Sequence, residues 1–256
     1  MDRLIFTANT AMAEYRLDRQ NMTHELANVA TTGFKKAYQI ANRSVRVEGD
    51  GFESRFLPRA FTSPQIDLAP GPRQFTGRPL DVAFDNKTLL AVHSKEGELA
   101  WTRRGDLGPD PEGFLRTGEG YAVLDPAGNE IQLPQGSVIF EIAADGSIST
   151  LDPNNPEAGS QLLTQLYIKD ATDVEIGRRE DGLFKPLTST EDGFEFEPIG
   201  GKPPSLTPGS LEGSNVNVVH TLVKFIDHMR SFEMQTKIIR EMKDNDTSGA
   251  SMMRLS

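Results

Sequence analysis

The chain has 256 residues, 37% of them hydrophobic, a formal net charge of −10 and no cysteine. Its length suits one large domain or two modest ones, and its acidic balance argues against a nucleic-acid partner, because phosphate binding needs clustered Lys and Arg. The lack of cysteine excludes a disulfide, a thiolate metal site and a cysteine nucleophile.

Near the N-terminus, apolar residues recur every three or four positions, which predicts a helix with one apolar side. We expect residues 30–34, where threonines precede Gly33, to end this helix. Charged residues within the first twenty positions leave no apolar core for a cleaved signal peptide. No run approaches the ~20 apolar residues that span a bilayer, so we expect no membrane insertion. The apolar side consists of Ile5, Ala8, Met12, Tyr15, Met22, Leu26 and Val29, with Arg19 interrupting it.

The middle of the chain predicts β structure. Residues 37–75 show no sustained period and carry Pro58, Pro64, Pro70 and Pro72, which indicates an extended arm. From Gly77 onward, short apolar runs alternate with turn residues, and Ala143-Ala144-Asp145-Gly146 indicates a hairpin. Such spacing is typical of an antiparallel β domain. The expected strands are 80–84, 89–92, 101–103, 114–117, 121–124, 130–133, 138–142, 148–151 and 165–169.

A second apolar seam follows Gly213 with heptad spacing, which favours a helix packed against other helices. Asn215 or Asn217 can cap its start, and Gly249 lies beyond its expected end. Nothing adjacent in sequence can cover this seam. Its residues are Val218, Leu222, Phe225, Met229, Phe232 and Ile239, with Thr236 in the one polar position; Val219, Ile226, Ile238 and Met242 lie on its flank.

The two seams predict an α+β fold in which the N- and C-terminal helices pair as a coiled-coil-like bundle. An antiparallel all-β domain and an extended arm are inserted between them. The expected parts are an N-terminal helix (1–33), the arm (34–75), a β-rich domain (76–205) and a C-terminal helix (206–256). An ordinary helical core that uses both termini is the alternative. An exposed seam forgoes about 1.5–3 kcal/mol per large side chain, so neighbouring subunits are expected to cover it.

Motifs for chemistry are missing. His24, His93, His220 and His228 lack metal-ligand spacing, and there is no G-x-S-x-G elbow. Residues 118–120 begin like a phosphate-binding loop, but Val123 occupies the third glycine position, so a β-turn is the better interpretation. The doublets Arg103-Arg104 and Arg178-Arg179 are expected at solvated positions. We therefore predict no enzyme activity and no catalytic, cofactor or metal site.

Five stretches of sequence resemble one known family. They are MDRLIF (1–6), LANVATTGFKK (26–36), TGRPLDVAF (76–84), WTRRGDLGPDPEGFLRTGEGYAVL (101–124) and GSLEGSNVNVVHTLVKFIDHMRSFEMQTKII (209–239). Together they resemble the rod and hook proteins of the bacterial flagellum, most closely the proximal rod members; distal rod and hook subunits are the alternatives. The tail 245–255 lacks the family's long helical ending. The positions that match the family signature are Leu26, Ala27, Asn28, Thr31, Thr32, Gly33, Phe34, Ser214, Asn215 and Asn217.

The resemblance implies a structural subunit, made in the cytoplasm and exported by the flagellar type III apparatus without a cleaved signal peptide. It would assemble helically through its terminal seams in the rod that crosses the periplasm. The implied partners are other copies of the chain, neighbouring proximal and distal rod proteins, and the export apparatus. An alternative from a different class is a secreted carbohydrate-binding β domain with dimerising helices. That function needs an aromatic platform, and Trp101 is the one tryptophan.

Overall fold

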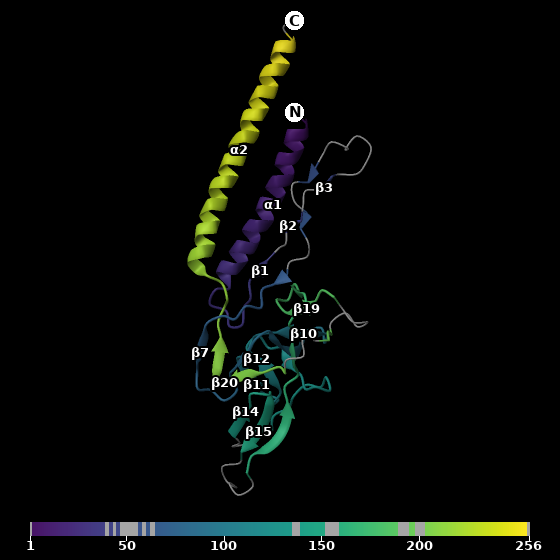
Figure 1. Ribbon diagram of the computed structural model, residues 1–256, viewed down its shortest axis with the longest axis vertical. Helices are drawn as coiled ribbons and strands as arrows, with labels where there is room; N and C mark the ends of the chain where they lie inside the picture. The colour runs from purple at the N-terminus through teal and green to yellow at the C-terminus, as the bar shows by residue number, and fades with distance from the viewer. Residues whose placement is uncertain are drawn as a thin grey trace. The chain divides into compact units, whose positions relative to one another are not determined.

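The computed structural model describes residues 2–38, 41–42, 45–46, 56–57, 60–61, 65–134, 139–151, 159–188, 195–197 and 203–254. The chain forms two compact units (Figure 1). The first, here called the helical unit, contains Met1–Ala27, Gln39–Ser63 and Asn217–Ser256. The second, the β unit, contains Asn28–Tyr38 and Pro64–Val216. The chain therefore passes between the units next to residues 28, 38, 64 and 216. Much of the predicted arm, including Pro58 and Pro64, lies outside the described residues.

In the helical unit, α1 (Asp2–Ala27) and α2 (Val218–Arg254) lie side by side (Figure 1). The side-chain oxygen of Asn217 accepts a hydrogen bond from the His220 amide at 3.0 Å, so Asn217, and not Asn215, caps α2. The 37 residues of α2 make a rod of about 55 Å. The sequence-based end before Gly249 was wrong, because α2 continues to Arg254. Two short antiparallel pairs complete the unit: β2 (Ala41–Asn42) with β5 (Ala60–Phe61), and β3 (Val45–Arg46) with β4 (Phe56–Leu57).

The predicted α+β fold with a coiled-coil-like bundle is wrong. Within the described part of the chain, most elements are strands, there are two helices, and they form no coiled-coil bundle. The predicted seam of α2 is not closed, since Val218, Leu222 and Met229 are 41%, 44% and 38% exposed. A coiled coil needs a continuous apolar seam, whereas the less exposed side of α2 mixes apolar and polar residues. These are Thr221, Phe225, His228, Phe232, Gln235, Thr236, Ile239 and Met242.

The largest sheet of the β unit has ten strands in the described residues, and all its neighbours are antiparallel. Its order is β1-β6-β18-β19-β10-β9-β13-β12-β11, with β17 also paired to β9. These strands are β1 (Ala37–Tyr38), β6 (Gln65–Ile66), β9 (Thr88–His93), β10 (Leu99–Thr102), β11 (Leu107–Pro109), β12 (Leu115–Thr117), β13 (Ala122–Val123), β17 (Ile168–Asp170), β18 (Ile176–Arg178) and β19 (Phe184–Pro186).

Smaller antiparallel groups complete the β unit. A three-stranded sheet contains β14 (Ile139–Ile142), β15 (Ser147–Leu151) and β16 (Gln161–Gln165). Two pairs bring distant parts of the sequence together: β7 (Arg73–Phe75) with β21 (Ser210–Glu212), and β8 (Val82–Phe84) with β20 (Leu206–Pro208). The last two pairings place the end of the β unit's chain beside its beginning.

Strand β9 is buried on both faces, as its continuous apolar run suggests. Leu90 and Val92 point into one core cluster, and Leu89 and Ala91 into another, because side chains alternate along a strand. The second cluster also contains Trp101, which is fully buried. The two clusters make β9 the centre of the β unit.

The hairpin predicted at residues 143–146 is confirmed. The Ala143 amide donates to the Ser147 carbonyl at 2.9 Å, and Gly146 has a φ of 86°. Residues 130–133, by contrast, contribute only isolated bridges of Glu130 and Gln132 within the described chain, where a strand was expected. The strands β18 to β21 lie in or beside a Gly- and Pro-rich region where none was predicted.

Candidate functional site: a buried ionic junction

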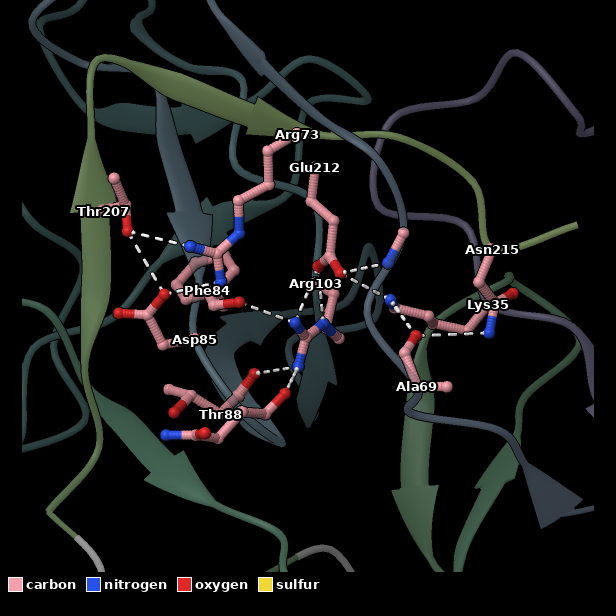
Figure 2. A network of polar contacts seen from close by, with 12 residues as sticks. Lys35, Ala69, Arg73, Phe84, Asp85, Thr88, Arg103, Thr207, Glu212 and Asn215 are labelled. Atoms are coloured by element: carbon pink, nitrogen blue, oxygen red, sulfur yellow. Dashed lines mark hydrogen bonds and ion pairs between the residues drawn. The ribbon is translucent and has the colours of Figure 1, made fainter.

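Three separate segments of the β unit meet around one buried carboxylate, that of Glu212 (Figure 2). Residues 33–36 follow α1 in sequence, residues 67–72 follow the stretch Gln39–Ser63 of the helical unit, and residues 210–216 lead to α2. Here these segments together are called the junction. Each junction segment is next to a point where the chain passes between the units, so the contacts at Glu212 hold the connecting chain together at one place in the β unit.

Glu212 lies between two cations. Its Oε1 accepts a hydrogen bond from Lys35 Nζ at 2.7 Å and another from the Gly71 amide at 2.9 Å. Its Oε2 accepts from Arg103 Nε at 2.8 Å. The side chains of Lys35, Arg103 and Glu212 are 0%, 0% and 1% exposed. Charges this deeply buried persist only when they are paired and hydrogen-bonded, so the three groups depend on one another.

Both cations also donate hydrogen bonds to backbone carbonyl oxygens. Arg103 donates to the carbonyl oxygens of Phe84 at 2.6 Å, Asn86 at 2.8 Å and Thr88 at 3.2 Å. Lys35 donates to the carbonyl of Ala69 at 2.8 Å. The guanidinium plane of Arg103 thus joins the turn between β8 and β9 to Glu212 on β21 (Figure 2), which a compact lysine ammonium could not do with the same geometry.

Lys35 should make the stability of the β unit depend on alkaline pH. Burial, helped by the Arg103 charge, lowers the pKa of Lys35 from 10.5 to about 8, although Glu212 opposes the shift. Between these pH values the unfolded chain binds more protons than the folded chain. The free energy of unfolding is therefore expected to rise with pH across this window, by up to about 3 kcal/mol.

Urea unfolding between pH 7.5 and 10.5, followed by Trp101 fluorescence, measures this dependence. Lys35→Met is the control, because it removes the titrating group and leaves the tyrosines that also ionise at high pH. The free energy of unfolding of the wild type minus that of Lys35→Met should rise from about pH 8 to pH 10.5, the window between the two pKa values of Lys35. Parallel pH profiles would show that Lys35 has the same pKa in both states.

Asn215 cross-links the same three segments with its amide. Its Oδ1 accepts from the Lys36 amide at 2.7 Å, and its Nδ2 donates to the Asp67 carbonyl at 2.8 Å. Its backbone amide donates to the Phe34 carbonyl at 3.2 Å. The sequence left Asn215 as one of two possible helix caps; in the structure it belongs to the junction.

Gly33 occupies a position that another residue would strain. Its φ is 68°, and a Cβ there would lie 2.4 Å from the Arg103 carbonyl oxygen. Its amide donates to the Glu212 carbonyl at 2.7 Å. The close approach of two backbones therefore requires glycine at this point of the junction.

Gly33→Ala is expected to destabilise the β unit more than Gly97→Ala. Gly97 also has positive φ, 79°, but a Cβ there would meet nothing within 4 Å. Gly97→Ala should cost about 1–2 kcal/mol for the left-handed backbone alone, and Gly33→Ala about 1–3 kcal/mol more for the clash. Urea unfolding followed by Trp101 fluorescence measures both. Equal losses would mean that the Arg103 backbone moves away without cost.

The other signature residues lie in the last turn of α1, in the turn that follows it and in the junction. Leu26 and Ala27 are in the last turn of α1, and Thr31 Oγ1 donates to Asn28 Oδ1 at 3.2 Å in the turn that follows. Phe34 is buried, with the Arg178 guanidinium 4.4 Å from its ring centroid. The remaining positions are Thr32, half-buried in that turn, and Ser214, whose hydroxyl accepts from the Val216 amide at 3.2 Å.

The predicted seam residues of α1 are placed only in part. The side chains of Ile5 and Ala8 lie outside the described ones, and Val29 lies beyond the end of α1. Tyr15 contacts the His228 ring of α2, with centroids 4.9 Å apart. The seam residues that are half-buried are Met12, Tyr15, Met22, Leu26 and Val29 in the N-terminal part, and Phe225, Phe232 and Ile239 in α2.

A different side of α2 carries exposed apolar residues. Val219, Val223 and Ile226 are 72%, 52% and 52% exposed and recur at spacings of four and three, so they share one side of the helix. We call these three residues the outer face of α2. The sequence placed Val219 and Ile226 only on the flank of the seam.

The centre of the junction was not predicted from the sequence. Arg103 was expected in solvent, yet it is buried, and Arg104 is paired with Asp106 at 2.7 Å. A charge directly after the apolar run 99–102 was a possible signal for Arg103. Nothing local marked Lys35 or Glu212.

Among the residues that the structure describes, no three His, Asp or Glu side chains group as metal ligands. Neither α1 nor α2, over its described length, has an apolar stretch that could cross a bilayer.

Two family models match the chain and define its class. The model described as flagellar hook protein FlgE/F/G D1 domain matches residues 83–150. The model described as flagellar basal body rod FlgEFG protein C-terminal matches residues 207–252, which include β21 and most of α2. The class is that of the rod and hook proteins of the bacterial flagellum.

Relatives specify the branch of this class. The chain is 39% identical over 259 residues to the flagellar basal-body rod protein FlgF of Escherichia coli K12, with both chains covered completely. It is 36% identical to FlgF of Salmonella typhimurium LT2, again over both full lengths. It is 29% identical to the rod protein FlgG of Bacillus subtilis 168, covering 93% of this chain and 94% of the relative. The chain belongs to the flagellar basal-body rod proteins of the FlgF type, which confirms the identification made from the sequence motifs.

Proposed function

We propose that the chain is a structural subunit of the proximal rod that assembles helically, through α1 and α2, with other copies of itself and with neighbouring rod subunits. The observation that carries this proposal is the match to basal-body rod proteins over the full length of the chain. The subunit has no catalytic activity and uses no cofactor in this proposal, because a polymer of this kind requires binding surfaces only.

The outer face of α2 supports assembly through the helices. Burying side chains such as Val219, Val223 and Ile226 yields about 1.5–3 kcal/mol each, which the isolated chain forgoes because they are exposed. Head-to-tail contacts that do not close produce an open helical filament. The proposed assembly interface combines this outer face with the seam residues of α1 and α2 named from the sequence.

The junction supports assembly in a second way. Lys35, Glu212 and Asn215 bind together the segments that lead to α1, to the stretch Gln39–Ser63 and to α2. We propose that they keep these three segments together at one place in the β unit when the subunit assembles.

The proposal includes the route and location of the subunit. It is made in the cytoplasm, exported by the flagellar type III apparatus without cleavage, and placed in the part of the rod that crosses the periplasm. Support comes from the names of the relatives, which are basal-body rod proteins.

The test is a single charge on the outer face of α2. Val219→Glu should prevent incorporation into basal bodies, and His220→Glu in the same helical turn should not.

No observation favours the carbohydrate-binding alternative, because Trp101, the one tryptophan, is fully buried and cannot serve as a platform for sugar rings.

A further inference from the structure

The last two strands of the β unit pair with strands from its beginning. Strand β20 pairs with β8 and places Leu206 opposite Phe84, and β21 pairs with β7 and places Ser210 opposite Phe75. In the described residues, β20 and β21 are the strand partners of β8 and β7. Residues 206–216, which contain β20 and β21 and lead to α2, are here called the closing segment.

Strand β8 is fully buried and obtains main-chain partners from the closing segment. All three of its residues are 0% exposed, and Phe84 belongs to the same core cluster as Leu206. The Gly209 amide donates to the Asp81 carbonyl at 2.8 Å, next to β8. A buried main-chain group without a hydrogen bond is costly, so the core around β8 needs the closing segment to reach its native burial.

The closing segment also carries the anion of the junction. In the described part of the chain, Glu212 is the acid that forms ion pairs with both Lys35 and Arg103, each at 2.7 Å. Both cations are 0% exposed. Without the closing segment, two positive charges would share a site from which water is excluded, and burial and mutual repulsion both disfavour that state.

The two requirements reach the centre of the β unit. Arg103 directly follows β10 and donates to the Thr88 carbonyl at the start of β9. Strand β9 contributes to both core clusters. A site that remains hydrated at Arg103 therefore opens the end of β9 that the cores are built around, and the loss of the closing segment is not confined to its own contacts.

We propose that the closing segment makes folding of the β unit conditional on its own arrival, so that the unit has no stable folded form in which residues 206–216 are detached. A chain that ends before residue 206 would then present no folded β unit, and only a chain that is complete up to α2 would do so. This proposal concerns folding and does not rest on the proposed assembly.

Hydrogen exchange of the full-length wild-type chain, followed residue by residue with NMR, tests the proposal. Two reporter amides lie in the closing segment: Leu206, which donates to the Ala144 carbonyl, and Gly209. The third, Ala91 in β9, donates to the Tyr167 carbonyl at 2.9 Å. If the unit opens only as a whole, the three protection factors should agree within about tenfold and fall together as urea is added.

The opposite result is also clear. If the segment can detach from a folded sheet, Leu206 and Gly209 will have protection factors more than about tenfold below that of Ala91, with little dependence on urea. That result would overturn the proposal, and the assembly of the chain into rods would be unaffected by it.

Glu212→Gln tests the part played by charge. It should lower the protection of Gly209 and Ala91 by the same factor, about a hundredfold or more. Glu119→Gln, which removes a 45% exposed partner of Arg104, should lower both by less than about fivefold. Loss of protection at Gly209 alone would overturn the proposal. If Glu212→Gln does not fold, the wild-type comparison decides by itself.

Discussion

Glu212→Gln is expected to lower the free energy of unfolding of the β unit by about 3–5 kcal/mol, since removing one partner of a buried ion pair leaves charge without compensation. Lys35 and Arg103 would then share a site from which water is excluded and which holds no anion of its own. Both side chains are 0% exposed, and Glu212 is the acidic partner of both. The amide of glutamine keeps the shape but offers a donor where Arg103 also donates.

Urea unfolding of the full-length chain, followed by Trp101 fluorescence, measures this loss, because Trp101 lies in the β unit two residues from Arg103. Glu119→Gln is the matched control. It removes a carboxylate that pairs with Arg104 at 2.6 Å but is 45% exposed, and exposed pairs contribute about 0–1 kcal/mol. Lys35→Met should cost less than Glu212→Gln, because Arg103 and Glu212 then remain as a neutral pair.

The double variant tests whether the loss of unfolding free energy comes from uncompensated charge. In Glu212→Gln with Lys35→Met, one of the two uncompensated cations is gone, so the combined loss should be smaller than the sum of the single losses. Strict additivity, or a Glu212→Gln protein as stable as wild type, would show that the junction does not depend on the Glu212 charge.

The parts of the fold that follow from local signals could be predicted. The run 89–92 indicated a buried strand, and residues 143–146 indicated the hairpin that joins β14 to β15. Gly33 was part of a recognisable motif, but the reason for glycine there is the Arg103 carbonyl oxygen, which a Cβ would meet at 2.4 Å and which lies seventy positions away in sequence. The local sequence therefore indicated that Gly33 matters, but it did not indicate that Arg103 is the residue it contacts.

The junction could not be predicted because its contacts are long-range. Lys35 and Glu212 are 177 residues apart, and Arg103 and Glu212 are 109 apart. Each charge taken alone fits a solvated position better than a buried one, so burial became visible only once all three were seen together. Pairing of β7 with β21 places Glu212 opposite Arg73, and the hydrogen bond from the Gly33 amide to the Glu212 carbonyl brings the segment of Lys35 to it.

The coiled-coil-like bundle was predicted wrongly for a different reason. The residues of α2 do follow heptad spacing. Near its start, however, α2 is apolar on more than one side, so the spacing alone does not determine which side faces α1. Val218, Leu222 and Met229 were assigned to the seam and are exposed, whereas Thr221, a polar residue that the pattern ignored, is 5% exposed. The apolar period thus identified the helix correctly, but it did not identify which side of the helix is the least exposed.

Val219→Glu is expected to abolish motility and incorporation into basal bodies while leaving the isolated chain intact. Val219 is 72% exposed, so the substitution should change the stability of the free chain by no more than about 0.5 kcal/mol. A carboxylate in the first turn is even favoured by the helix dipole. In an assembled rod the same side chain would be buried against a neighbour, where an unpaired charge costs several kcal/mol at every subunit.

His220→Glu is the matched control, because His220 is exposed, lies in the same turn and acquires the same charge without removing an apolar side chain. Motility in soft agar and the subunit content of purified basal bodies are the two readouts, in cells whose only copy carries the variant. Val219→Glu chain recovered outside the cell but absent from basal bodies would locate the defect in assembly and not in export. Cells that swim normally with Val219→Glu would show that the outer face of α2 stays in solvent within the rod, and the helices would then have to assemble through other sides.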